Sequence, residues 1–336
     1  MYIGIGDVTT DHRGIGPMKL QSDEVACAAQ VLDEVKSRAV NEGEILSDQV
    51  GTSYRLLSWL SPDGLNIRAR DYGKHDDTVL PLLCLPGLTR NARDFEPVAA
   101  YFVQKRMRVL VVDSRGRGAS DWDPDSANYN VLRELDDVYG LVDALGIDKV
   151  AALGTSRGGI LMMMSAQKRP DFIQKVILND IGPRVELAGL IKIKDLVGRE
   201  FSDLTWEKAI FALSLGQGSQ FPRLDPAGWE RYARRLWKDV DGKPVHDHDP
   251  ALKVTVASLT PETKLPENWD GFAALARWPT LVLRGALSDI LSAATLEEMQ
   301  ARCPTIETHI VPDEAHVPLL EDGPTLLAME RLLLTR

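Results

Sequence analysis

The chain has 336 residues, with 39 basic and 49 acidic side chains that give a formal net charge of -10. This acidic balance argues against nucleic acid or an anionic membrane surface as the main partner. No apolar run reaches the roughly 18 to 20 residues that would cross a bilayer. We therefore expect a globular protein that acts on a small molecule.

The cysteines and the first residues point to a reducing compartment. Cys27, Cys84 and Cys303 are odd in number and have no CxxC spacing, which is typical of reduced structural thiols. The opening sequence MYIGIGDVTTDHRG shows no basic segment followed by an apolar one, so we see no signal peptide. We expect a cytoplasmic protein.

Residues 1–50 differ from the rest of the chain. Apolar residues recur with helical spacing within residues 21–40, between flanks that are polar or rich in glycine. We interpret this segment as an N-terminal extension with one amphipathic helix.

From there the sequence predicts a doubly wound α/β fold. Residues 54–60 and 65–72 are joined by Ser-Pro-Asp-Gly, which predicts a hairpin. Continuous apolar runs follow, as expected for strands buried on both faces of a parallel sheet; they cover residues 79–87, 107–116, 149–156, 175–182, 279–285 and 306–313. Segments of helical length separate most of them, for example 129–146 and 157–170. This alternation predicts a mostly parallel sheet with helices on both faces.

The alternation stops within residues 183–276. That segment has a helical pattern, many aromatic side chains and seven prolines, six of which divide it into short helices. We interpret residues 183–276 as a helical cap inserted into an α/β core formed by 51–182 and 277–336.

Gly154-Thr155-Ser156-Arg157-Gly158 fits the pattern G-x-S-x-G, and it lies between a predicted strand and a predicted helix. A serine on such a turn has a strained backbone, and its small neighbours let strand and helix approach closely. The helix N-terminus beside it favours developing negative charge. We therefore predict that Ser156 is a nucleophile.

A serine nucleophile needs a base that is held by a third group. His316 follows the last predicted strand, at the carboxyl edge where ligands bind in open α/β sheets. His309 lies within that strand and is expected to pack. His246 and His248 lack the partners of a metal site, and we expect them in a solvated loop.

Three aspartates end predicted strands and compete for the role of the acid. Asp289 follows the strand at 279–285 and is our preferred candidate. Asp180 is its rival, at the end of the strand at 175–182. Asp113 begins a tight loop, SRGRGAS, and is expected to fix the backbone there together with Arg115.

Taken together, these motifs resemble the α/β-hydrolase fold superfamily from about residue 54 to 336. The stretches LPGLTRNARDF, VVDSRGRGAS, GALSDIL and EAHVPLLED resemble its oxyanion, structural, acid and histidine loops. The order Ser156, Asp289, His316 is the order of the family. The resemblance implies an oxyanion hole from the backbone N–H groups of Arg157 and Leu88, although Pro86-Gly87 replaces the His-Gly of many relatives.

The predicted activity is ester hydrolysis through an acyl-enzyme, with no metal or organic cofactor. The same groups could open a lactone, cleave a carbon–carbon bond or hydrolyse an amide, and a non-catalytic small-molecule receptor is the alternative from another class. The aromatic cap suggests an apolar pocket lined by Trp206, Phe211 and Trp229. Arg90 and Arg93 are interpreted as salt-bridged surface residues, the alternative being contact with a substrate carboxylate. The sequence leaves homo-oligomer formation open.

Overall fold

The computed structural model describes residues 40–335, apart from 75, 77 and 198–203. The predicted amphipathic helix and Cys27 lie outside these residues. The structure confirms the predicted α/β class.

Over the described residues, nine strands form one sheet in the order β1-β2-β3-β5-β4-β6-β7-β10-β11. Their bounds are β1 (Asn41–Ser47), β2 (Ser53–Leu60), β3 (Asn66–Tyr72), β4 (Leu82–Leu85), β5 (Val109–Asp113), β6 (Val150–Thr155), β7 (Ile173–Asn179), β10 (Thr280–Gly285) and β11 (Glu307–Val311). β1, β2 and β3 pair in antiparallel fashion, and β3 pairs antiparallel with β5. The remaining pairs, which join β5, β4, β6, β7, β10 and β11, are parallel. The predicted hairpin is the pair β2 and β3. The sheet begins at Asn41, inside the segment that we assigned to the extension.

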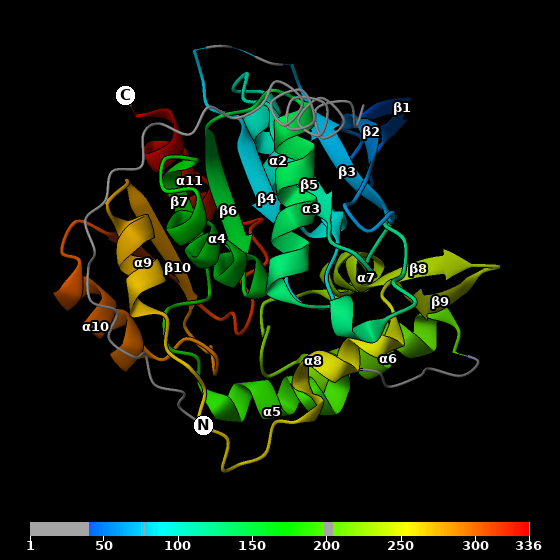
Figure 1. Cartoon of the computed structure of the whole chain (residues 1–336). Helices are drawn as coiled ribbons and strands as arrows, with labels where there is room; N and C mark the ends of the chain where they lie inside the picture. Colours follow the sequence, from blue (N-terminus) through cyan, green and yellow to red (C-terminus); the bar gives the residue numbers. More distant parts are fainter. Residues whose placement is uncertain (1–39, 75, 77, 198–203, 336) are drawn as a thin grey trace, which may run out of the picture. The chain divides into compact units, whose positions relative to one another are not determined.

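Helices cover both faces of this sheet (Figure 1). Residues of α3 (Val131–Ala144), α4 (Arg157–Lys168), α9 (Trp269–Ala276) and α10 (Ala293–Arg302) share one apolar core with one face. Residues of α2 (Glu96–Val103) and α11 (Gly323–Leu334) share a second core with the other face. The central strands β4, β5 and β6 are buried at every position, which explains their continuous apolar sequences.

The inserted segment lies beyond the carboxyl ends of the parallel strands, below the sheet in Figure 1. It contains α5 (Leu187–Leu196), α6 (Trp206–Gln217), α7 (Pro226–Leu236), β8 (Trp237–Val240), β9 (Lys243–His246) and α8 (Val254–Ala257). It has a small apolar core of its own, built on Phe221, Trp229 and Tyr232.

Two features of the insertion differ from the prediction. The strands β8 and β9 form a hairpin within a segment expected to be helical only. The helix α9, which we placed in the cap, packs on α4 and belongs to the sheet's core through Phe272 and Leu275. A helical apolar pattern does not reveal which surface the helix covers, and this explains the misplaced boundary.

None of the helices described here is long and apolar enough to cross a membrane. Cys84 is buried in the sheet and Cys303 is partly buried, and both are free thiols.

Candidate active site

Ser156 stands on a sharp turn between β6 and α4. Its backbone has φ of 51° and ψ of -114°, a strained combination for a residue with a side chain. A Cβ at Gly158 would collide with the carbonyl oxygen of Leu85, and one at Gly159 would collide with Ile181. The Ser156 N–H donates to the Asn179 carbonyl at 3.0 Å, which ties the turn to β7. Glycine is therefore required around the serine because strand and helix approach so closely.

His316 lies in the loop after β11 and faces Ser156. Its Nε2 is 2.9 Å from Ser156 Oγ. Its Nδ1 is 2.7 Å from Oδ2 of Asp180. The N–H of Ala315 donates to the Gln220 carbonyl of the cap at 3.0 Å, which helps to fix the histidine loop. The arrangement can deprotonate the serine hydroxyl and stabilise the imidazolium that results.

The carboxylate partner of His316 is Asp180, and our preference for Asp289 was wrong. Asp180 follows β7 and is fully buried. Its Oδ1 accepts from the Gly285 N–H at 2.9 Å, and its Oδ2 also accepts from Ser288 Oγ at 2.6 Å. These bonds fix the carboxylate so that Oδ2 can accept from the imidazole.

Asp289 instead lies at the mouth of a cavity, where it forms an ion pair with Lys192 of α5 at 2.6 Å. Its side chain is 40% exposed. The loop after β10 does contribute to the site, but through Ser288 and the Gly285 N–H, which hold Asp180. The strand-end position of Asp180 in VILNDIG was the signal that could have identified it.

The backbone N–H groups of Leu88 and Arg157 carry no intrachain hydrogen bond among the residues that the structure describes. Arg157 begins α4 directly after the serine. A Cβ added at Gly87 would lie 3.7 Å from the Cβ of Ser156, so the loop that carries Leu88 runs beside the serine. Both donors are thus available near the position that a tetrahedral oxyanion would take.

A buried ion network connects these two backbone segments. Arg117 donates through Nε to the Leu88 carbonyl at 2.7 Å and through Nη1 to Glu134 at 3.0 Å. Arg157 also donates to both carboxylate oxygens of Glu134, through Nε and Nη2, at 2.9 to 3.1 Å. Burial would raise the pKa of Glu134, but the two guanidinium groups lower it to about 2. The guanidinium of Arg157 therefore helps to brace the loop that lacks the His-Gly of many relatives.

The neighbouring SRGRGAS loop fixes the backbone, as its sequence suggested. Asp113 accepts from the N–H groups of Ala92 at 2.7 Å and Ala119 at 3.0 Å. Arg115 is completely buried, and among its bonds are two to Asp137, at 2.8 and 2.7 Å. Neither Asp113 nor Arg115 lines the cavity beside Ser156.

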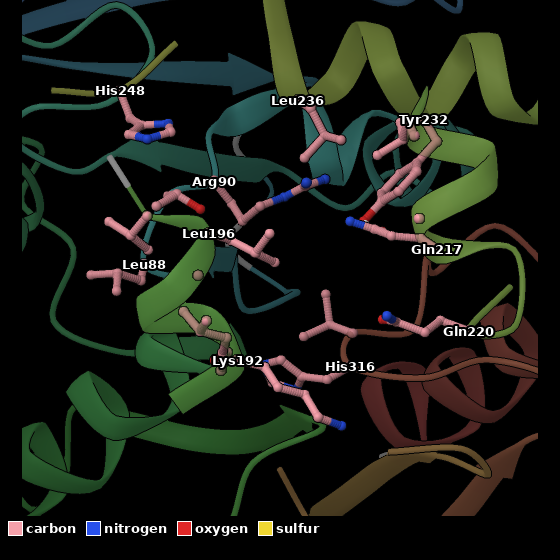
Figure 2. Close-up of a pocket in the computed structure, with 18 of the residues that line it drawn as sticks. Leu88, Arg90, Lys192, Leu196, Gln217, Gln220, Tyr232, Leu236, His248 and His316 are labelled. Carbon is pink, nitrogen blue, oxygen red and sulfur yellow. Dashed lines mark hydrogen bonds between the residues drawn. The ribbon is translucent and has the colours of Figure 1, made fainter. Parts of the chain in front are cut away.

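Ser156 and His316 open into a cavity of about 460 Å³ between the sheet and the insertion (Figure 2). Its wall on the cap side is mostly aliphatic and comes from α5, α6 and α7, with Ile193, Leu196, Ala209, Ala212, Leu213 and Leu236. The Lys192–Asp289 pair lies on its rim.

None of the three aromatic residues that we expected to line the pocket does so. Trp206 packs near Trp237, and its indole N–H donates to Asp239. Phe211 is 64% exposed on α6, and Trp229 is buried in the cap's own core. Their size predicted burial, but the sequence does not show which side of each cap helix faces the cavity.

The prediction of a solvated loop for His246 and His248 was also wrong. Both line the cavity, and His248 is only 6% exposed. Burial, with His246, Arg117 and Arg90 nearby, lowers the pKa of His248 to about 4, so it is neutral at pH 7. Among the described residues no group of three or more histidine, cysteine or acidic side chains has the arrangement of a metal site.

The comparisons with known proteins agree with this fold. Residues 81–323 match the family model of the alpha/beta hydrolase fold. A 3-hydroxybutyrate-oligomer hydrolase from Cupriavidus necator is 34% identical over 80% of this chain and 92% of its own. A 2-(acetamidomethylene)succinate hydrolase from Mesorhizobium japonicum is 28% identical over 75% and 84% of the two chains.

Among solved structures, an alpha/beta hydrolase from Novosphingobium aromaticivorans superimposes with a TM-score of 0.77. It is 40% identical and covers 83% of this chain and 98% of its own.

Proposed function

Because the chain belongs to the α/β-hydrolase fold family and is a hydrolase, we propose that it cleaves carboxylic esters through an acyl-enzyme on Ser156. One observation carries the proposal: the line of hydrogen bonds from Ser156 Oγ to His316 at 2.9 Å and on to Asp180 at 2.7 Å, at the floor of an apolar cavity. This is the arrangement that activates a serine for acyl transfer.

In the proposed first step, His316 Nε2 takes the Ser156 proton while Oγ attacks the ester carbonyl. The N–H groups of Leu88 and Arg157 donate to the developing oxyanion. Asp180 holds the imidazole by accepting from Nδ1–H and stabilises its positive charge. His316 then protonates the leaving alcohol as the acyl-enzyme forms. Water, deprotonated by His316, releases the acid and restores Ser156.

Two features support an ester of a short acyl chain as the substrate. The aliphatic cap wall favours apolar groups over charged ones at the acyl position. The relative from Cupriavidus necator is named for hydrolysing oligomers of a hydroxy acid, and the units of such oligomers are joined by esters. Hydrolysis of a lactone, an amide or a carbon–carbon bond by the same catalytic groups is the alternative. The relative from Mesorhizobium japonicum is named for hydrolysing a substrate with an acetamido group.

The test is turnover of p-nitrophenyl butyrate together with labelling of the protein by a fluorophosphonate. We expect hydrolysis and one covalent adduct at Ser156. Ser156→Ala should abolish both, with a fall in kcat on the order of 10⁶-fold and little change in unfolding. Failure of both readouts in the wild-type protein would contradict the ester hydrolase and favour a receptor on this fold.

A further inference from the structure

Three polar side chains of the cavity lie close together on one part of its wall. Figure 2 shows Arg90, Tyr232 and Gln217 on the side away from His316. Many of the other lining residues, such as Ile193, Leu196 and Leu213, are aliphatic. A few convergent polar groups in an apolar cavity are what fixes a ligand's orientation.

Arg90 contributes a buried positive charge to this part of the wall. Its side chain is 12% exposed and pairs with Asp94, which accepts from Nε at 2.7 Å and from Nη2. That ion pair does not use Nη1. The guanidinium carbon lies 5.3 Å from the centre of the Tyr232 ring, which helps to hold its plane. The neighbouring Asp94 carboxylate raises the pKa of Arg90 against the opposing effect of burial, so the group stays charged.

Gln217 adds a second donor next to Arg90. The hydroxyl of Tyr232 donates to Gln217 Oε1 at 3.2 Å. This bond assigns the carbonyl side of the amide to Tyr232 and leaves Nε2 as a donor for another group. A guanidinium nitrogen and an amide nitrogen close to each other can donate to an acceptor with two oxygens. A carboxylate has two such oxygens, and its negative charge complements the positive charge of Arg90.

The position of Arg90 sets how far this acceptor lies from the reacting carbonyl. A Cβ added at Gly87 would lie 3.2 Å from Cγ of Arg90 and 3.7 Å from Cβ of Ser156. The arginine stem therefore starts near the nucleophile, and its guanidinium lies beside Tyr232 on the cavity wall, a side-chain length away. A carboxylate separated from the scissile ester by a short carbon chain spans such an interval.

We propose that Arg90 and Gln217 form a subsite for the free carboxylate of the substrate, so that the protein acts on esters of short hydroxy acids with an ionised end. This inference rests on the proposed ester hydrolysis and names its substrate class. It also gives Arg90 the role that the sequence offered only as an alternative to a surface ion pair.

The experiment compares two substrates that release acetate from the same ester bond. One is 3-acetoxybutyrate, which ends in a carboxylate, and the other is 3-acetoxybutyramide, which ends in a neutral amide. We expect kcat/KM of the wild-type protein to favour the carboxylate by about tenfold or more. Arg90→Met should reduce this ratio to about one, because it removes the charge that tells the two ends apart.

Arg93→Met is the matched control. Arg93 belongs to the same loop and pairs with Asp247 at 2.7 Å, but it does not line the cavity. Its ratio should equal that of the wild-type protein. Gln217→Leu provides an independent variant should Arg90→Met fail to fold, and we expect it to lower the ratio about threefold.

A wild-type ratio near one, or a ratio that both Arg90→Met and Gln217→Leu leave intact, would overturn the subsite. If p-nitrophenyl butyrate is still hydrolysed in that case, the ester hydrolase stands and only the subsite falls. If no ester is hydrolysed, the proposed function fails as well.

Discussion

The two walls of the cavity are built in different ways. The sheet wall, formed by Ser156 and His316 with Asp180 behind them, is fixed by buried hydrogen bonds to backbone and side chains of four strand ends. The cap wall, formed by the lining residues of α5, α6 and α7, consists mainly of aliphatic side chains. Directional bonds hold the sheet wall to one geometry, whereas aliphatic packing on the cap wall tolerates a change of shape. We infer that the sheet wall determines the reaction and the cap wall determines which substrate fits.

After the loss of Ser156 itself, the largest expected effect is on the sheet wall, at Asp180. Asp180→Asn should lower kcat by about 10⁴-fold, because the imidazole loses the partner that sets its tautomer and stabilises its charge. Asp289→Asn breaks only a partly exposed ion pair, worth about 1 kcal/mol or less, and should lower kcat less than tenfold. Steady-state kinetics with p-nitrophenyl butyrate distinguish the two. A larger loss of kcat in Asp289→Asn than in Asp180→Asn would show that Asp289 is the catalytic acid.

The next effect concerns the network that braces the sheet wall. Glu134→Gln leaves the buried guanidinium groups of Arg117 and Arg157 without a carboxylate, which should cost about 3 kcal/mol of unfolding free energy. The N–H groups of Leu88 and Arg157 should then shift, and kcat should fall about 10- to 100-fold with a smaller change in KM. Affinity for a boronic acid that forms a tetrahedral adduct on serine should fall in parallel.

Asp137→Asn is the control for that network. It breaks a buried ion pair with Arg115, which does not touch Leu88 or Arg157. This variant should also lose stability but keep its kcat. Equal losses of kcat in the two variants would mean that the effect of Glu134 is general destabilisation.

A smaller effect is a dependence of stability on pH at the histidine loop. Burial raises the pKa of Glu314 from its usual 4.5 to about 7, and its carboxylate accepts from the Leu319 N–H at 2.7 Å. A raised folded pKa contributes stability that is complete below pH 4.5 and is lost as the pH rises through 7. The free energy of unfolding of Glu314→Gln should therefore exceed that of the wild-type protein by about 3 kcal/mol at pH 8 and nearly equal it at pH 4.5. Urea unfolding at both pH values measures this, and a difference independent of pH would contradict it.

The smallest effect tests the cap wall. Ala212→Phe fills part of the cavity from α6 and should lower kcat/KM for long acyl chains about tenfold while sparing acetyl esters. Phe211→Ala changes the adjacent but exposed residue, and its profile over acyl-chain length should match that of the wild-type protein. A loss for every chain length in Ala212→Phe would show that the cap wall also affects the reaction itself.

The sequence was most informative where the backbone itself is constrained. The apolar strands, the glycines around Ser156 and the strand-end position of His316 follow from periodicity and close packing, and the structure brings these two side chains together. The choice between Asp180 and Asp289 depends on a tertiary contact: Ser288 and Gly285 hold the earlier aspartate. Asp180 directly follows β7, whereas Asp289 lies four residues beyond the end of β10, so the strand-end position of Asp180 was the one local signal in its favour. Trp206, Phe211 and Trp229 were misplaced for a related reason, since aromatic content predicts burial but not the cavity that a helix faces.

The position of Asp180 also divides the proposed triad along the chain. The proposed nucleophile and acid lie within residues 156–180, before the insertion, and only His316 comes from beyond it. A break in the exposed turn at Asp241-Gly242 of the β8–β9 hairpin would give one fragment with Ser156 and Asp180 and another with the base. Neither fragment would hydrolyse esters alone. Ester turnover would report their reassembly, so this fold provides a natural site for a split enzyme.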